Sequence, residues 1–150
     1  MSTEKTILLV EDNEDDRLLT IRAFSKAGVV NTVIPVNDGV EACDYLFGTG
    51  QYAERGPTAP LPQLVLLDLN LPRVDGLEVL RRIRLDARTK LLPVVVLTSS
   101  NEEEDILRSY VAGANSYVRK PVDFTQFSEA AKNLGLFWLL LNEAPPGGTR

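Results

Sequence analysis

Short runs of aliphatic residues alternate with longer stretches of mixed polarity along most of the chain. Five runs are free of charged side chains: Thr6–Val10, Thr32–Val36, Leu64–Leu67, Val94–Leu97 and Ser116–Val118. Continuous apolar runs of this length are typical of strands that are covered on both faces. The stretches between them can hold helices, which are the usual connections between parallel strands. The pattern therefore predicts an α/β fold with five parallel strands.

The stretches between the runs have the spacing of amphipathic helices. The first, from Glu14 to about Ala27 before Gly28, repeats apolar residues every three positions, at Leu18, Ile21, Phe24 and Ala27. Further helices are expected near residues 39–47, 76–87, 102–112 and 124–141, the last two capped by Asn101 and Asp123. We expect one domain over residues 1–142 with an extended C-terminal helix, followed by a flexible tail at 143–150.

Residues 48–63 do not fit a minimal repeat of strand and helix. This segment has three glycines and three prolines, and we expect a long loop. It also contains a G-x-G-x-x-A match, from Gly48 to Ala53. A dinucleotide-binding fingerprint must join a strand to a helix, whereas this match follows a predicted helix, so we discount it.

Composition narrows the classes of protein that the chain can be. A length of 150 residues with 44% hydrophobic, 25% charged and 7% aromatic residues is typical of one globular domain. The densest apolar stretch, at 134–141, is far shorter than the roughly 20 residues that span a bilayer. The N-terminus has no signal-peptide pattern. We expect a cytoplasmic protein with no membrane partner.

Histidine is absent, and this excludes histidine-based triads, histidine-bound zinc and phosphohistidine carriers. The single cysteine, Cys43, lies in an apolar stretch and is interpreted as a buried structural thiol. The net charge is −5, and five of the six residues at 11–16 are acidic. This charge disfavours binding to nucleic acid and favours binding of a cation.

Polar side chains follow the apolar runs at the points where parallel strands would end. Glu11 and Asp12 follow the first run, Asp68 and then Asn70 the third, Thr98 the fourth and Lys120 the fifth. Because ligands bind at the carboxyl ends of strands in open parallel sheets, we expect these side chains to converge. Their oxygens suit Mg²⁺, and Asp68 could act as a carboxylate nucleophile that becomes an aspartyl phosphate.

Each of these features alone has an ordinary structural interpretation. The pair Glu11-Asp12 could favour the positive end of a helix, Asp68 could belong to a turn and Thr98 could cap a helix. The dipeptide Lys120-Pro121 is uninformative by itself. Only their joint occurrence at four strand ends favours a shared site.

The loop from Asp68 reads Asp-Leu-Asn-Leu-Pro-Arg-Val-Asp-Gly. With Glu11-Asp12, Thr98, Tyr117 and Lys120-Pro121, it resembles the receiver domain of two-component response regulators over about residues 5–141. The resemblance implies a doubly wound, flavodoxin-like (βα)5 sheet with strand order 2-1-3-4-5. The long 48–63 segment and the C-terminal continuation resemble single-domain regulators that accompany bacterial and cyanobacterial phytochromes.

The resemblance also implies a mechanism. Asp68 would accept a phosphoryl group from the phosphohistidine of a histidine kinase. The protein would then be a signalling protein and not an enzyme, although it would take part in its own phosphotransfer and autodephosphorylation. Mg²⁺ would be held by Asp12, Asp68 and Asn70, and by Glu11 through water. Lys120 and Thr98 would contact phosphoryl oxygens, and the ring of Tyr117 would turn inward as part of the switch.

Three alternatives have features that separate them from this interpretation. A haloacid-dehalogenase-like phosphohydrolase requires Asp-x-Asp on its first strand, whereas Asp68-Leu-Asn70 follows the third run. A receiver-like binding module that works without phosphate would be expected to lack a motif residue. A DNA-binding regulator would need a helix-turn-helix after residue 141. Output is therefore expected to pass through protein contacts.

The predicted C-terminal helix is apolar on more than one side. Phe124, Phe127, Ala131, Leu134, Trp138 and Leu141 form one stripe, and a second group lies on the other faces: Leu136, Phe137, Leu139 and Leu140. One sheet cannot cover both groups. We expect a symmetric homodimer through this helix region.

Overall fold

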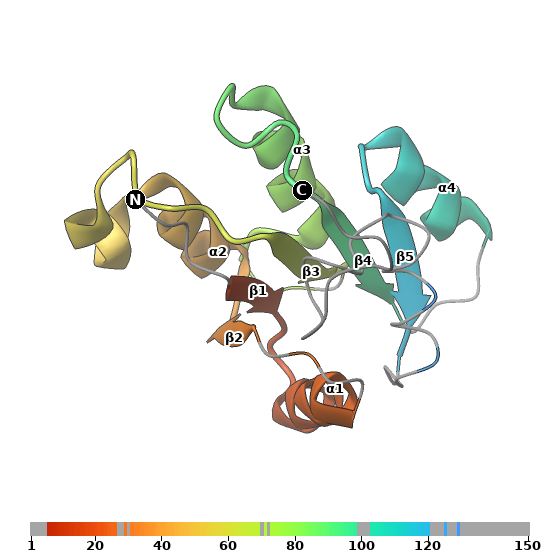
Figure 1. Cartoon of the computed structure of the whole chain (residues 1–150). Coiled ribbons are helices and arrows are strands. Elements are labelled where there is room, and N and C mark those ends of the chain that lie inside the picture. Colours follow the sequence, from red (N-terminus) through yellow and green to blue (C-terminus); the bar gives the residue numbers. More distant parts are fainter. Residues whose placement is uncertain are drawn as a thin grey trace, which may run out of the picture.

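Five parallel strands form one sheet in the order β2-β1-β3-β4-β5 (Figure 1). The computed structural model describes residues 6–26, 29, 31–69, 71, 73–98, 103–120, 125 and 129. The strands are β1 (Thr6–Val10), β2 (Thr32–Val36), β3 (Leu64–Asp68), β4 (Val94–Thr98) and β5 (Ser116–Arg119). The predicted α/β class and strand order are confirmed, and β3, β4 and β5 each extend one residue beyond the predicted run.

Helices cover both faces of the sheet. They are α1 (Glu14–Lys26), α2 (Gly39–Phe47), α3 (Gly76–Leu85) and α4 (Glu103–Val111). In Figure 1, α1 lies on one face, and α2, α3 and α4 lie on the other. Helix α3 ends two residues earlier than predicted, because Asp86 has an extended backbone (ψ 131°). The described part of the chain contains no helix of the length and hydropathy needed to cross a membrane.

The strands differ in burial according to their place in the sheet. All five residues of β1, β3 and β4 are buried, as their continuous apolar runs predict. The same prediction is wrong for β2, in which only Val36 is buried, and for β5, in which only Val118 is buried. These strands form the two edges of the sheet, so each has a neighbour on one side only.

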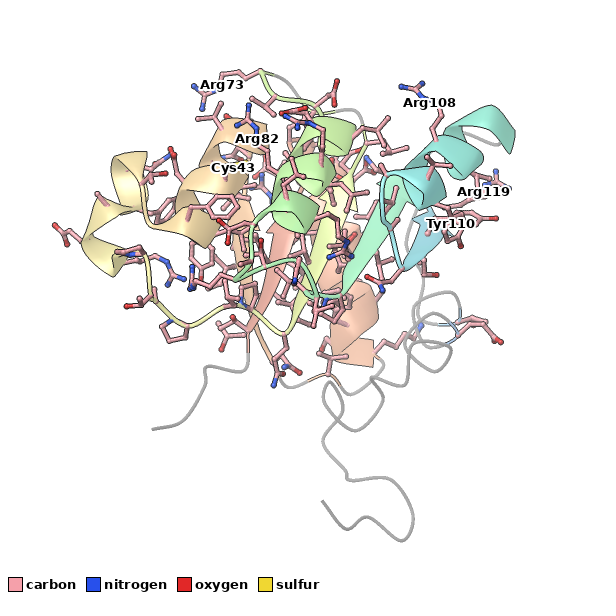
Figure 2. The ribbon with its side chains drawn as sticks, turned by 90° about the horizontal axis from the view of Figure 1, so that it is seen from above. Cys43, Arg73, Arg82, Arg108, Tyr110 and Arg119 are labelled. Carbon is pink, nitrogen blue, oxygen red and sulfur yellow. The ribbon has the colours of Figure 1, made fainter. Side chains whose placement is uncertain are left out.

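The face of α1 that packs on the sheet differs from the predicted one. Thr20, Ala23 and Phe24 are buried, whereas Leu18 is 54% exposed. A spacing of three residues drifts by about 60° per step around an α-helix, so Leu18 is turned well away from Phe24. The cysteine prediction is confirmed: Cys43 is buried on α2, and Figure 2 shows it beside Arg82. Burial raises the pKa of its thiol.

Two aspartates that the sequence analysis did not assign begin the helices that follow β2 and β3. Asp38 caps α2 by accepting from the Glu41 amide at 2.8 Å, and Asp75 caps α3 by accepting from the Glu78 amide at 3.0 Å. A glycine follows each cap, because another segment of the backbone passes close to that position. A Cβ atom on Gly76 would lie 2.3 Å from the carbonyl oxygen of Asp68, so α3 starts directly against the end of β3.

The 48–63 segment is more ordered than the predicted loop. It contains a 3₁₀ helix, η1 (Gly50–Arg55), whose turns are closed by bonds such as that from the Tyr52 amide to the Thr49 carbonyl. Gly48 ends α2 in the left-handed conformation. The G-x-G-x-x-A match therefore begins at the end of a helix, as expected.

Several predictions lie outside the described residues. These are the caps Asn101 and Asp123, the terminator Gly28, most of the helix over 124–141 and the tail over 143–150. The division into a domain over 1–142 and a tail stays a prediction.

Candidate functional site

Three carboxylates meet at the carboxyl edge of the sheet. Strands β1 and β3 are parallel neighbours with Val10 opposite Leu67, so Glu11 and Asp68 leave the sheet at the same level. One oxygen from each of Glu11, Asp12 and Asp68 lies within 4.8 Å of the others. Glu11 and Asp68 are buried, and Asp12 is exposed. The convergence of these three acids agrees with the expectation from the sequence.

Lys120 places its ammonium group among these acids. Its Nζ lies 2.9 Å from Glu11 Oε1 and 3.0 Å from Asp68 Oδ2. The backbone amide of Lys120 donates to the carbonyl of Thr98 at 2.8 Å, which continues the pairing of β5 with β4. The side chain is only 13% exposed. Lys120 thus supplies positive charge to a buried acidic pocket.

Asp16 is a member of the site that the sequence analysis did not single out. It lies in the first turn of α1, and its Oδ2 is 3.1 Å from Lys120 Nζ. The sequence signal was its place in the acidic segment 11–16, and that signal is weak because five of these six residues are acidic.

Burial governs the electrostatics of the pocket. It raises the pKa of Glu11 to about 7, although Lys120 and the Asn13 amide favour the ionised form. Burial also opposes the charge of Lys120, but its contacts with Glu11 and Asp68 outweigh this effect and raise the pKa of the amine. Four nearby carboxylates with one ammonium group leave an excess of negative charge. This donor set fits a hard divalent cation such as Mg²⁺.

Thr98 lies next to this pocket in the sheet, and Tyr117 lies on the neighbouring strand β5, opposite Val96. Thr98 is the last residue of β4 and is buried, one position after Leu97, which stands opposite Asp68. Tyr117 on β5 is half-buried, and its ring meets that of Tyr110 on α4 edge to face, with centroids 6.1 Å apart. Asn70, the fourth predicted metal ligand, lies outside the described residues.

An open parallel sheet with an acidic pocket and a partly buried lysine at its carboxyl edge is the arrangement typical of a receiver-type signalling domain. The chain matches the response regulator receiver domain family over residues 7–132, and it belongs to that family.

Individual relatives cover nearly the whole chain. The probable methanogenesis regulatory protein FilR2 of Methanothrix harundinacea (strain 6Ac) is 40% identical over 139 residues, covering 93% of this chain and 86% of FilR2. Response regulator Rcp1 of Synechocystis sp. (strain ATCC 27184 / PCC 6803 / Kazusa) is 37% identical over 135 residues, covering 90% and 89%.

Solved structures agree with the fold. The bacteriophytochrome response regulator AtBRR is 50% identical, with a TM-score of 0.83, and the match covers 95% of this chain and all of that one. The Mn²⁺-bound form of Rcp1 has a TM-score of 0.72 at 37% identity and covers 90% of this chain and 94% of that one.

Proposed function

We propose that this response regulator accepts a phosphoryl group on Asp68 from the phosphohistidine of a histidine kinase. The observation that carries the proposal is the placement of Asp68: a buried carboxylate at the end of central strand β3, 3.0 Å from Lys120 and beside two further acids. An Asp68 oxygen would supply the electron pair for the new O–P bond. The N–P bond would break with its pair returning to the imidazole, which takes up a proton from solvent.

The acidic pocket is the proposed site of Mg²⁺. Asp12 and Asp68 would bind the ion directly, Glu11 through water, and Asn70 would complete the protein ligands. The ion, when bound, neutralises the carboxylates and the negative oxygens of the phosphoryl group. The fit rests on the three carboxylates within 4.8 Å and on the burial of Glu11, whose ionised form needs a compensating cation.

Lys120, Thr98 and Tyr117 are proposed to turn phosphorylation into a surface change. The ammonium group of Lys120 would contact a phosphoryl oxygen and give up part of its pairing with Glu11 and Asp16. The hydroxyl of Thr98 would donate to another oxygen, and the ring of Tyr117 would move inward from its contact with Tyr110. Downstream proteins would read the altered surface.

Intact-mass measurement tests the central proposal. Incubation with acetyl phosphate and Mg²⁺ should add one phosphoryl group, and Asp68→Asn should take up none. Asp75→Asn is the matched control, because Asp75 caps α3 and lies outside the acidic pocket. A chain that stays unmodified would support a receiver-like module that works without phosphate. Continued modification of Asp68→Asn would move the phosphoacceptor elsewhere.

For the partner, we propose a bacterial phytochrome kinase. The support is the similarity to AtBRR, a bacteriophytochrome response regulator, at 50% identity. The similarity to FilR2 at 40% makes a kinase of another pathway the competing outcome. Phosphotransfer from purified kinases of the same cell decides between them: the cognate kinase should label the chain within seconds to minutes, and the others much more slowly.

We also propose a homodimer through the helix predicted over 124–141. The support is the apolar character of residues such as Phe137 and Leu140, which one sheet cannot cover. Analytical ultracentrifugation should show a dimer at tens of micromolar, and the double variant Phe137→Lys, Leu140→Lys should be a monomer. A wild type that sediments as a monomer would contradict the proposal.

A further inference from the structure

The turn formed by Asn37 and Asp38, between β2 and α2, is tied to the loop that follows β1. One nitrogen of the Arg17 guanidinium, Nη2, donates to the carbonyl oxygen of Glu11 at 2.7 Å and also to Oδ1 of Asn37. Arg17 lies on α1, so a single side chain joins α1, the Glu11-Asp12 backbone and the turn. The carbonyl that it holds belongs to one of the three clustered acids.

The same turn is tied to the loop that follows Asp68. Asp38 accepts two bonds from the guanidinium of Arg73, at 3.0 and 3.2 Å. Arg73 has a left-handed backbone (φ 66°), and Figure 2 shows it beside α2. The backbone of the turn and the backbone of this loop are in contact here, because a Cβ atom on Gly39 would lie 1.9 Å from the carbonyl oxygen of Val74. One turn thus contacts both loops that follow the strands of the pocket, the loop after β1 and the loop after β3.

Glu41, on α2, fixes the conformation of the turn by hydrogen bonds. Its Oε1 accepts from the backbone amide of Asn37 at 2.9 Å and from the Asn37 side-chain amide at 3.3 Å. The Glu41 amide donates to Asp38 at 2.8 Å. These bonds leave the side-chain oxygen of Asn37, Oδ1, directed at Arg17. The orientation of both turn side chains is therefore set by one residue of α2.

The 48–63 segment completes this network. The hydroxyl of Tyr52, on η1, donates to the second oxygen of Glu41 at 2.8 Å. The ring of Tyr52 packs edge to face on buried Tyr45, with centroids 5.2 Å apart, so the hydroxyl is held in place by the core. Arg55 of η1 stacks on the other ring, 3.8 Å from the Tyr45 centroid. Helix η1 is thereby connected to the Asn37–Asp38 turn by two successive hydrogen bonds, from Tyr52 to Glu41 and from Asn37 to Glu41.

We propose that the Asn37–Asp38 turn, held through Glu41 by Tyr52 of η1, positions the acidic pocket for its cation. The pocket must gather carboxylates that repel one another, and a backbone held before the ion binds lowers the cost of that arrangement. Arg17 and Tyr52 are positioning residues, because they act on the pocket through Glu11 and Glu41. The inference rests on the proposed Mg²⁺ site and assigns a role to the 48–63 segment.

Calorimetric titration of the full chain with Mg²⁺ tests the proposal. Arg17→Met should weaken Mg²⁺ binding about tenfold, the low end of the range for residues that orient metal ligands. Asn37→Ala should weaken it by about threefold in the wild type and not at all in the Arg17→Met background, because Arg17 is the bridge from Asn37 to Glu11. A merely structural role would give independent effects of the two changes.

Tyr52→Phe tests the hydrogen bond from η1 to Glu41, and Thr49→Val is its control. Each removes one hydroxyl hydrogen bond of 2.8 Å from the same segment, but Thr49 bonds to Asp44 and not to Glu41. Both should lower the metal-free Tm by a similar small amount. Only Tyr52→Phe should weaken Mg²⁺ binding, by about twofold to threefold, less than a directly tied residue.

The outcomes separate this inference from the proposed function. If Asp12→Ala weakens Mg²⁺ binding while Arg17→Met and Tyr52→Phe bind as the wild type does, the pocket stands and the positioning role is wrong. If the wild-type chain binds no Mg²⁺, both fail. Tyr52→Phe is conservative enough to keep the test decisive even if Arg17→Met does not fold.

Discussion

The ammonium group of Lys120 lies 3.0 Å from a carboxylate oxygen of Asp68, although 52 residues separate them in the chain. The same group reaches Glu11 and Asp16. The pocket therefore already holds one internal cation, and any added cation or phosphoryl group must share or replace these contacts. This relationship makes Lys120 the first residue to test.

Lys120→Met should lower the free energy of unfolding of the metal-free protein by about 2–3 kcal/mol, because it leaves buried Glu11 and Asp68 without their cation. Saturating Mg²⁺ should still bind and should recover much of the loss. Urea unfolding with and without Mg²⁺ measures both effects. Lys90→Met, at an exposed position, should change stability by less than about 0.5 kcal/mol. An unchanged urea midpoint for Lys120→Met would contradict the role of the ion pairs.

The raised pKa of Glu11 predicts an unusual pH dependence. In the folded state this pKa is about 7, mainly because of burial, against an ordinary value of 4.5. The folded state therefore binds the proton more tightly, and the metal-free protein should lose stability as pH rises from about 4.5 to about 7. Lys120, whose pKa is raised, stays charged throughout this interval.

Thermal unfolding between pH 5 and pH 7.5 checks this sign. The chain has no histidine whose titration would obscure the effect. Glu11→Gln, which cannot ionise, should flatten the slope. Mg²⁺ affinity of the wild type should rise over the same interval, because the ion favours the carboxylate over the carboxylic acid. A metal-free Tm that rises with pH would contradict the shifted pKa.

Asp12→Ala should weaken Mg²⁺ binding by roughly 1–3 kcal/mol, the range for a lost charge-assisted contact. Asp16→Ala removes a charge from the same segment, but Asp16 faces Lys120 and is not one of the three clustered acids. It should therefore change the affinity much less. Calorimetry on both variants compares their Mg²⁺ affinities directly. Equal losses of affinity would mean that Asp12 acts only through its charge and not as a ligand.

Arg84 is predicted to be the arginine of α3 that matters most for stability. Its guanidinium donates to four acceptors at 2.7–3.1 Å: the carbonyls of Lys90, Leu92 and Gly113 and the side chain of Asn115. Arg84→Met should destabilise the fold by about 2–4 kcal/mol, because four acceptors, two of them in part-buried bonds, lose their shared donor. Arg81→Met should cost less than about 1 kcal/mol, since it breaks an exposed pair with Glu78. Urea unfolding of the two variants is the measurement.

Much of the fold could be read from the order of residues alone. Runs such as Thr6–Val10 gave strands at the predicted positions, because short aliphatic runs without charge are typical of strands in a parallel sheet. Helix α2 runs over Gly39–Phe47 as predicted. The exposure of most of β2 and of Leu18 could not be read in this way, because it depends on which neighbours cover each face.

The sequence by itself determined the chemistry of the site: which acids, hydroxyl and amine follow the strands, and that parallel strands bring Glu11, Asp68 and Lys120 to one edge. Only the tertiary structure decided the further partners, because Asp16 reaches Lys120 and Arg17 reaches the Glu11 carbonyl by orientation rather than by sequence position. Arg17 meets Asn37 and Tyr52 meets Glu41 because helix packing sets the distance and direction between them. No periodicity along the chain encodes such contacts. The hydrogen bonds that link η1 to the acidic pocket could therefore be identified only from the packed structure.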